Sequence, residues 1–161
     1  MVFTIDYRIN LLNLNLQASE LNMSLPIEKF REIVVAVVFA YEYGDQSEET
    51  LISALMELLS VTKKNVCLAI EQAKKVIEQQ PVIDQHLREL SENFEFERIG
   101  KAELAVLRVC MYSILHEKEI PAKAMISEGI RLGKKFSSQD SAKFINAILD
   151  TFSKKQEPTP Q

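Results

Sequence analysis

The chain has 161 residues, 47% of them hydrophobic, and a mean hydropathy of −0.05, which excludes a disordered chain and predicts one soluble domain with a sizeable core. Its longest apolar run, residues 33–41, is too short to cross a bilayer, and no basic segment followed by an apolar run opens the chain, so we expect a cytoplasmic protein with no membrane partner. The net charge of −4, from 19 basic and 23 acidic residues, disfavours nucleic-acid binding by the molecule as a whole.

The charge is spread unevenly along the chain. Residues 1–60 hold three Lys or Arg and nine Asp or Glu, whereas residues 61–161 hold sixteen and fourteen. Residues 120–155 hold seven basic and three acidic side chains. A local basic surface can bind phosphates on an acidic protein, but charge alone favours the simpler interpretation of a solvated helix face.

Residues 1–25 form an N-terminal extension whose structure the sequence leaves open. Ile5, Ile9, Leu12 and Leu16 recur at helical spacing, but four asparagines lower the helix propensity of the segment. A helix and a partly extended arm are both compatible with this pattern.

The next segments carry the caps and the spacing of helices. Pro26 suits the first turn of a helix, and Gly44 ends the apolar stripe that follows it. The β-branched run of residues 33–38 is also compatible with a strand, but its apolar residues do not alternate and its polar flanks keep a 3.6-residue period, so we predict a helix. Ser47 is typical of the N-cap of a second helix, which ends near Leu59.

Five further helices are predicted from the same kinds of signal. Their expected starts are Thr62, Pro81, Gly100, Pro121, and either Ser137 or Ser138. Ser137 and Asp140 also have nearly the spacing and chemistry of a capping box. The helix after Pro121 is expected to face inward with Ala124, Ile126, Ile130 and Leu132. The last helix is expected to face inward with Phe144, Ile145, Ile148, Leu149 and Phe152.

Together these elements predict an all-α fold, a compact helical bundle of about seven helices in two sub-bundles. The predicted helical domain covers residues 26–153, and residues 154–161 are predicted to be a disordered tail. Cys67 and Cys110 lie on apolar helical faces, which we interpret as two reduced, buried thiols rather than a disulfide or a metal site.

No pattern in the chain indicates catalysis or a cofactor. His86 and His116 lie thirty residues apart without a nucleophile or an orienting acid at a suitable spacing. Glu95 and Glu97 could mimic paired carboxylates, but the sequence shows no pocket around them, and we interpret them as solvated. Glycine-rich phosphate loops and metal-binding motifs of the HExxH and CxxC kinds are missing. We therefore predict a protein that is not an enzyme, with no metal and no cofactor.

A series of short sequence motifs in the C-terminal part of the chain resembles one protein family. It begins with residues 99–108, Ile-Gly-Lys-Ala-Glu-Leu-Ala-Val-Leu-Arg, and continues with Tyr112, Ile120-Pro121, Glu128-Gly129-Ile130, Lys134-Lys135-Phe136 and residues 140–150, Asp-Ser-Ala-Lys-Phe-Ile-Asn-Ala-Ile-Leu-Asp. In order and spacing the series resembles the NusB family of bacterial transcription antitermination factors. A looser similarity reaches back to Lys29.

The resemblance implies a function in which the chain catalyses no reaction. The chain would pair with NusE, a small-subunit ribosomal protein, and bind a single-stranded leader element in nascent ribosomal RNA. As part of an RNA polymerase antitermination complex, it would help the polymerase to pass terminators. The RNA would be held where the two proteins meet.

The resemblance also implies RNA-binding residues near the start of the domain. The family's first helix opens with an arginine-rich stretch, but here residues 26–32 keep only Lys29 and Arg31, which alternate with acids. Because each lost phosphate contact weakens binding, we expect RNA affinity to be low or to depend on a partner that supplies positive charge. Phe39 occupies an aromatic position beside the RNA, with an ordinary core role as the alternative.

Three residues of the last helix complete the implied RNA site. Lys143 would take a phosphate. Asp140 would hydrogen-bond a base edge or complete the helix cap, and the two roles are not exclusive. Phe144 would stack on a base or belong to the core, and the apolar pattern favours the core.

The implied partner surface includes Glu103, a carboxylate suited to a basic ribosomal protein, and Tyr41, two residues beyond the RNA-facing aromatic. The alternative for Glu103 is an acid in the first turn of a helix, where the helix dipole favours it. Arg108, in contrast, is interpreted as a structural ion-pair or helix-surface residue.

Two other functions compete with antitermination. The reduced basic motif and the acidic N-terminal part favour a protein-interaction scaffold of the same fold, with weak or lost RNA binding. Related helical domains also precede RNA cytosine methyltransferase domains, but the chain is too short to hold the αβ catalytic domain of such an enzyme. The identity of the RNA, the oligomeric state and the role of residues 1–25 stay open.

Overall fold

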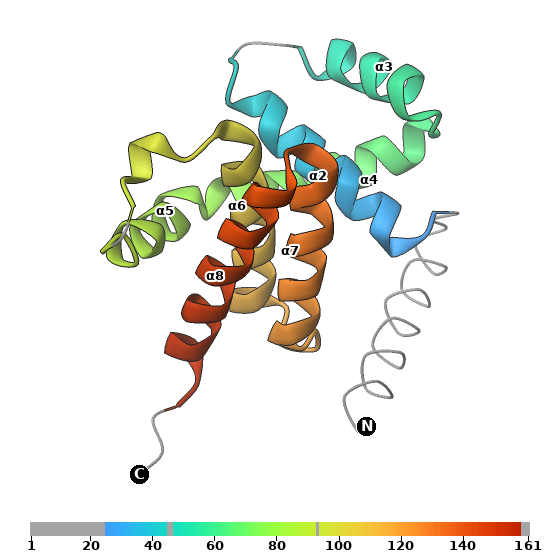
Figure 1. The fold of residues 1–161 in the computed structure, drawn as a ribbon. Coiled ribbons are helices and arrows are strands. Elements are labelled where there is room, and N and C mark those ends of the chain that lie inside the picture. Colours follow the sequence, from blue (N-terminus) through green and yellow to red (C-terminus); the bar gives the residue numbers. More distant parts are fainter. Residues whose placement is uncertain (1–24, 45–46, 93, 159–161) are drawn as a thin grey trace. The chain divides into compact units, whose positions relative to one another are not determined.

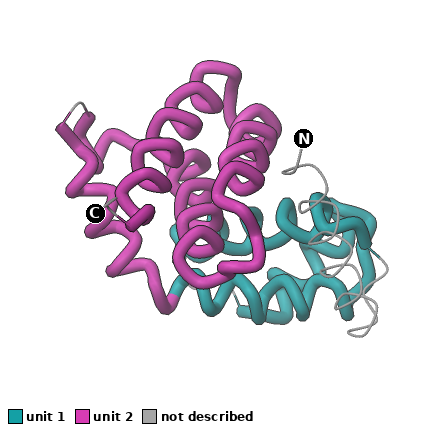
Figure 2. The backbone as a smooth tube through the Cα atoms, turned by 90° about the horizontal axis from the view of Figure 1, so that it is seen from below, with its two compact units in different colours: residues 1–77 teal, residues 78–161 magenta. Residues whose placement is uncertain are grey.

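The computed structural model describes residues 25–44, 47–92 and 94–158, so the predicted N-terminal extension lies outside the described residues except for its last position. Within the described ranges the chain forms seven α-helices and one short 3-10 helix, with no strand (Figure 1). This confirms the predicted all-α class and the number of helices. The chain divides into two compact units, residues 1–77 and 78–161 (Figure 2).

The first unit contains α2 (Ile27–Tyr41), α3 (Glu48–Leu59) and most of α4 (Lys63–Glu78). Its predicted caps are confirmed. The Ser47 hydroxyl accepts the Thr50 N–H at 3.2 Å, and the Thr62 hydroxyl accepts the Asn65 N–H at 3.3 Å. The β-branched run in α2 is helical, and its members Ile33, Val34, Val35, Val37 and Val38 are all buried. The run is continuous because most of the circumference of this helix is covered, which removes the polar positions that a half-buried helix would show.

The second unit contains α5 (Gln80–Glu89), the 3-10 helix η1 (Phe96–Arg98), α6 (Lys101–His116), α7 (Ala122–Phe136) and α8 (Gln139–Gln156). Helices α6, α7 and α8 lie side by side and contribute most of its core (Figure 1). The prolines and the glycine open their helices as predicted, with Gly100 and Pro121 at N-caps and Pro81 at the second position of α5.

The buried face of α7 differs from the predicted one. The structure buries Met125, Glu128, Gly129, Leu132 and Gly133, so only Leu132 of the four predicted residues is fully buried. The reason is the close approach of α8. A Cβ on Gly133 would lie 3.2 Å from the backbone Cα of Ala142, and a Cβ on Gly129 would lie 2.5 Å from Leu149 Cδ1. Because the two glycines face α8, the bulkier isoleucines turn to the sides of the helix.

The start and the end of α8 differ from the predicted ones. Ser138, not Ser137, is the N-cap, and its hydroxyl accepts the Ser141 N–H at 3.1 Å. The predicted capping box of Ser137 and Asp140 is therefore wrong, because its two residues are not at the N-cap and the third helical position. The helix continues through Gln156, so the predicted domain end at residue 153 lies within it, and residues 154–156 are helical.

A buried ion pair joins α5 to α6. Arg108 donates from Nε to Asp84 Oδ1 at 2.9 Å and from Nη2 to Asp84 Oδ2 at 2.8 Å, and Arg108 is only 3% exposed. Of the two interpretations of Arg108 from the sequence, the structural ion pair is confirmed and the helix-surface residue is wrong, because the side chain is buried. Cys67 and Cys110 form no disulfide. Cys110 is buried as predicted, whereas Cys67 is only half-buried. None of the described helices is both long enough and apolar enough to span a bilayer.

Candidate functional site

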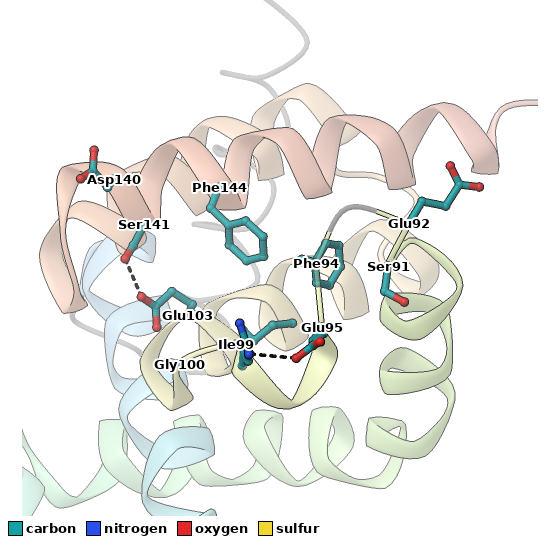
Figure 3. A pocket seen from close by; sticks show the side chains of 11 residues that line it. Ser91, Glu92, Phe94, Glu95, Ile99, Gly100, Glu103, Asp140, Ser141 and Phe144 are labelled. Atoms are coloured by element: carbon teal, nitrogen blue, oxygen red, sulfur yellow. Dashed lines mark hydrogen bonds and ion pairs between the residues drawn. The ribbon is translucent and has the colours of Figure 1, made fainter.

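A pocket of about 670 Å³ opens in the second unit where η1, the N-terminus of α6 and the start of α8 meet (Figure 3). The segment that leads from α5 into η1 forms one wall, and the first two turns of α8 form the other. The lining residues are Ser91, Glu92, Phe94, Glu95, Arg98, Ile99, Gly100, Glu103, Asp140, Ser141 and Phe144. Three predicted site residues, Glu103, Asp140 and Phe144, therefore share one concave surface.

Two aromatic rings form the apolar part of the pocket. Phe144 meets Phe94 edge to face, with ring centroids 5.4 Å apart and ring planes at 88°. Both rings are half-buried, so Phe144 is neither a fully enclosed core residue nor a free platform. On the α5 side, the Arg88 guanidinium lies 4.0 Å from the centroid of the Phe96 ring, which helps to fix the segment that carries Phe94.

The charged groups of the pocket are mainly acidic. Four carboxylates line it, from Glu92, Glu95, Glu103 and Asp140, against the single guanidinium of Arg98. Arg98 is itself paired with Glu95, at 2.8 Å from Nε to Oε2. Such a surface repels phosphate and attracts cations. Glu95, interpreted from the sequence as solvated, is exposed but lies on the pocket wall.

Glu103 is the most firmly held of these acids. Its Oε1 accepts hydrogen bonds from the hydroxyls of Ser137, at 2.8 Å, and Ser141 (Figure 3 draws the second). Burial by itself raises the pKa of the Glu103 carboxyl, but the hydrogen bonds from Ser141, from its own backbone and from Ser137 outweigh this effect and leave the pKa below its usual value. The carboxylate is therefore charged at neutral pH and fixed in direction.

Asp140 and Lys143 are exposed on the first turns of α8. Lys143 Nζ lies 4.0 Å from Asp140 Oδ1, and the Lys143 side chain is 78% exposed. An ion pair so open to water holds its members weakly, so Lys143 can turn to a phosphate. Lys143 does not line the pocket, whereas Asp140 does.

The other four predicted residues lie on α2, in the first unit. Lys29 is half-buried and pairs with Glu32, at 3.6 Å between Nζ and Oε2. Arg31 is 6% exposed, which leaves little of its guanidinium for a phosphate. Phe39 packs against Tyr43 at 5.0 Å between ring centroids, and Tyr41 is 42% exposed. Their roles in RNA and partner binding stay predictions.

Sequence reasoning missed part of the pocket. Ser91, Phe94, Arg98 and Ile99 line it, and Ser137 with Ser141 fixes its central acid. Phe94 and Phe144 are fifty residues apart, so no local pattern joins them. The serines carried a signal, a polar cluster at a helix start, but a cluster of that kind usually indicates only a cap.

The lining of the pocket consists mainly of aromatic rings and carboxylates. Among the described residues no group of three or more His, Cys, Asp or Glu side chains is placed to hold a metal. The aromatic rings offer stacking or apolar contact, and the carboxylates offer hydrogen-bond acceptors. These are means of recognition, suited to a cation, an amino group or a base edge.

Comparison with known proteins identifies relatives for most of the chain. The sequence profile of the NusB family matches residues 28–154. The protein named transcription antitermination protein NusB from Clostridium tetani is 31% identical over 147 residues, which cover 86% of this chain and 96% of the relative. A protein of the same name from Desulfitobacterium hafniense is 33% identical over 122 residues, covering 74% and 82%. The solved structure of T. maritima NusB superposes with a TM-score of 0.68 at 29% identity and covers 84% of this chain and 96% of that one.

Proposed function

This chain belongs to the NusB family of transcription antitermination proteins, and from that premise we propose that it binds single-stranded leader RNA together with a NusE-type ribosomal protein. The family consists of non-enzymatic factors, so its action rests on surfaces. The proposed complex acts on RNA polymerase as it transcribes ribosomal RNA operons.

The observation that carries the proposal is the convergence of Glu103, Asp140 and Phe144 on one acidic, aromatic pocket. We assign Glu103 to a cationic side chain of the partner. We assign Phe144 to stacking against an unpaired base and Asp140 to an amino group on a base edge. Lys143, outside the pocket, takes a phosphate. Lys29, Arg31 and Phe39 are proposed as further RNA contacts on α2, and Tyr41 as a further partner contact.

The charge of the pocket supports partner dependence. Four carboxylates against one paired guanidinium repel the RNA backbone. A basic partner that occupies Glu103 would cancel part of this repulsion, and RNA could then bind beside it. The chain would thus be a poor RNA binder alone and a good one in the pair.

The test is a fluorescence-anisotropy titration of a short single-stranded ribosomal leader RNA, with and without equimolar NusE, at two salt concentrations. We expect binding to appear or tighten strongly with the partner and to weaken with salt, because phosphate contacts release counterions. Equal RNA affinity with and without the partner would contradict the proposal.

A protein-interaction scaffold with weak or lost RNA binding is the second candidate function. The burial of Arg31 favours it, because α2 then offers Lys29 as its main cation at the position of the family's basic motif. In the same titration this candidate predicts association of the two proteins with no RNA bound under either condition.

A further inference from the structure

We propose that Ser137 and Ser141 are positioning residues that hold the Glu103 carboxylate ready for a cationic side chain of the protein partner. The inference rests on the proposed function, because it takes the pocket as the partner's docking site. It assigns a role in recognition to two serines at the α7–α8 junction, a place where serines ordinarily serve as helix caps.

The first observation is that both serines converge on one oxygen from another helix. The hydroxyls of Ser137 and Ser141 both donate to Oε1 of Glu103, across sequence separations of 34 and 38 residues. The two hydroxyls also lie 2.8 Å from each other. The cap of α8 does not need this arrangement, because Ser138 already accepts the Ser141 N–H. The hydrogen bonds from Ser137 and Ser141 to Glu103 therefore have a role other than capping α8.

The second observation is the space that the chain leaves for the other oxygen. A Cβ on Gly100 would lie 2.1 Å from Glu103 Oε2, so the carboxylate occupies room that any other residue at the N-cap of α6 would fill. Gly100 and Glu103 both line the pocket. With both serines on Oε1, Oε2 lies beside Gly100, and this is the oxygen that we assign to a donor from the partner.

The third observation concerns charge. The serine hydrogen bonds act against burial and keep the pKa of Glu103 low. The other charged groups that line the same pocket are Arg98 with its partner Glu95, and Glu92 and Asp140 on the rim. None of them donates to Glu103, so the two serines are the side-chain donors that fix its direction, beside the hydrogen bond from its own backbone N–H.

A fixed, ionised acceptor improves affinity because the side chain loses no rotamer freedom when the partner arrives. Without the serines, Glu103 keeps its charge but can turn away from the pocket. We therefore expect the double substitution Ser137→Ala with Ser141→Ala to weaken partner binding by about threefold to tenfold, the range that one immobilised side chain corresponds to.

The experiment measures the affinity of the full chain for NusE by isothermal titration calorimetry and the pKa of the Glu103 carboxyl by NMR. The variants are the double serine variant, Ser141→Ala alone, Glu103→Gln and, as a matched control, Ser127→Ala, an exposed serine on α7. Melting curves check that each variant is folded, and the single Ser141→Ala variant replaces the double one if the double one is not.

The expected result is weaker binding and a raised Glu103 pKa in the serine variants, with Ser127→Ala unchanged. A purely structural role for the serines would leave partner affinity at its original value. Unchanged or tighter binding in the serine variants, together with weaker binding in Glu103→Gln, would overturn the positioning role and leave the docking site intact. Unchanged binding in Glu103→Gln would instead overturn the docking site itself and, with it, the role of the serines.

Discussion

At the scale of single residues, Glu103 shows how hydrogen-bond donors can outweigh burial. Its pKa is lower in the folded chain than the ordinary value of 4.5. The stability that it contributes is therefore complete above that ordinary value and is lost as the pH falls through the lower, folded value. Stability increases with pH in this range because the folded state favours the charged form of Glu103.

We expect the double variant Ser137→Ala with Ser141→Ala to be less stable than the unchanged chain at neutral pH. The difference should shrink as the pH falls below 4.5, because protonated Glu103 is a weaker acceptor in both proteins. Urea unfolding over a pH series measures the two free energies. A difference that stays constant over the whole series would mean that the serines stabilise the chain by another route.

Lys143 is the residue on which the proposed RNA site is most easily tested. Because its side chain is exposed and only weakly paired with Asp140, its removal should leave the fold unchanged. We expect Lys143→Ala to weaken RNA binding in the presence of NusE and to lower the salt slope by about 0.7, the value for one phosphate contact on a single strand.

Lys155, exposed near the other end of α8, provides the matched control for this experiment. Lys155→Ala should leave both the RNA affinity and the salt slope unchanged. Equal effects of the two substitutions would indicate a general attraction of RNA to basic side chains, and Lys143 would then be removed from the site.

At the scale of helices, a buried ion pair links α5 to α6. Asp84 and Arg108 form two hydrogen bonds to each other and are both buried. We expect Asp84→Ala to destabilise the chain by about 3–5 kcal/mol, because it leaves a buried guanidinium without its carboxylate. Replacing both partners by Leu and Met should restore much of this loss. Chemical denaturation of the single and double variants measures their free energies of unfolding. An unchanged free energy of unfolding in Asp84→Ala would argue against this role of the pair.

The α7–α8 contact depends on the absence of side chains at two positions. An alanine in a helix is favoured over glycine by about 1 kcal/mol, but at Gly133 its Cβ would press on the backbone of Ala142. We expect Gly133→Ala to destabilise by about 1–3 kcal/mol. Gly129→Ala should have a smaller effect, because its nearest neighbour is the flexible end of Leu149. Thermal melts of both variants test the order, and a more stable Gly133→Ala protein would refute it.

The helices themselves were largely predictable because their signals are local. Ser47, Thr62, Gly100 and Pro121 each act through their own backbone or one turn of helix, and each was found where its chemistry placed it. The buried face of α7 was not predictable in the same way. Glycine carries no hydrophobic signal, so the apolar periodicity predicted that the isoleucines face the core. In the structure Gly133 faces α8 instead, because only a residue without a side chain fits there.

At the scale of the whole molecule, the pocket could not be predicted from local sequence signals. The resemblance placed Glu103, Asp140 and Phe144 on two helices, but their convergence depends on how α6 and α8 pack in the second unit. The partners Phe94 and Ser137 come from connecting segments, which have no periodicity to read. Residue types were thus predictable, whereas their grouping into one acidic, aromatic pocket needed the tertiary structure.

The extent of the family match bears on residues 1–24, for which the sequence left several roles open. The family profile begins at residue 28, and 84% of this chain is enough to cover 96% of T. maritima NusB. The family profile therefore does not extend over this segment. We expect a chain that begins at Leu25 to keep its helical circular dichroism and to unfold cooperatively, because the described core is formed by residues beyond that point. Loss of cooperative melting would show that residues 1–24 are part of the fold. With the fold retained, a change in RNA affinity, partner affinity or sedimentation mass would assign the segment to the RNA surface, the partner interface or a dimer.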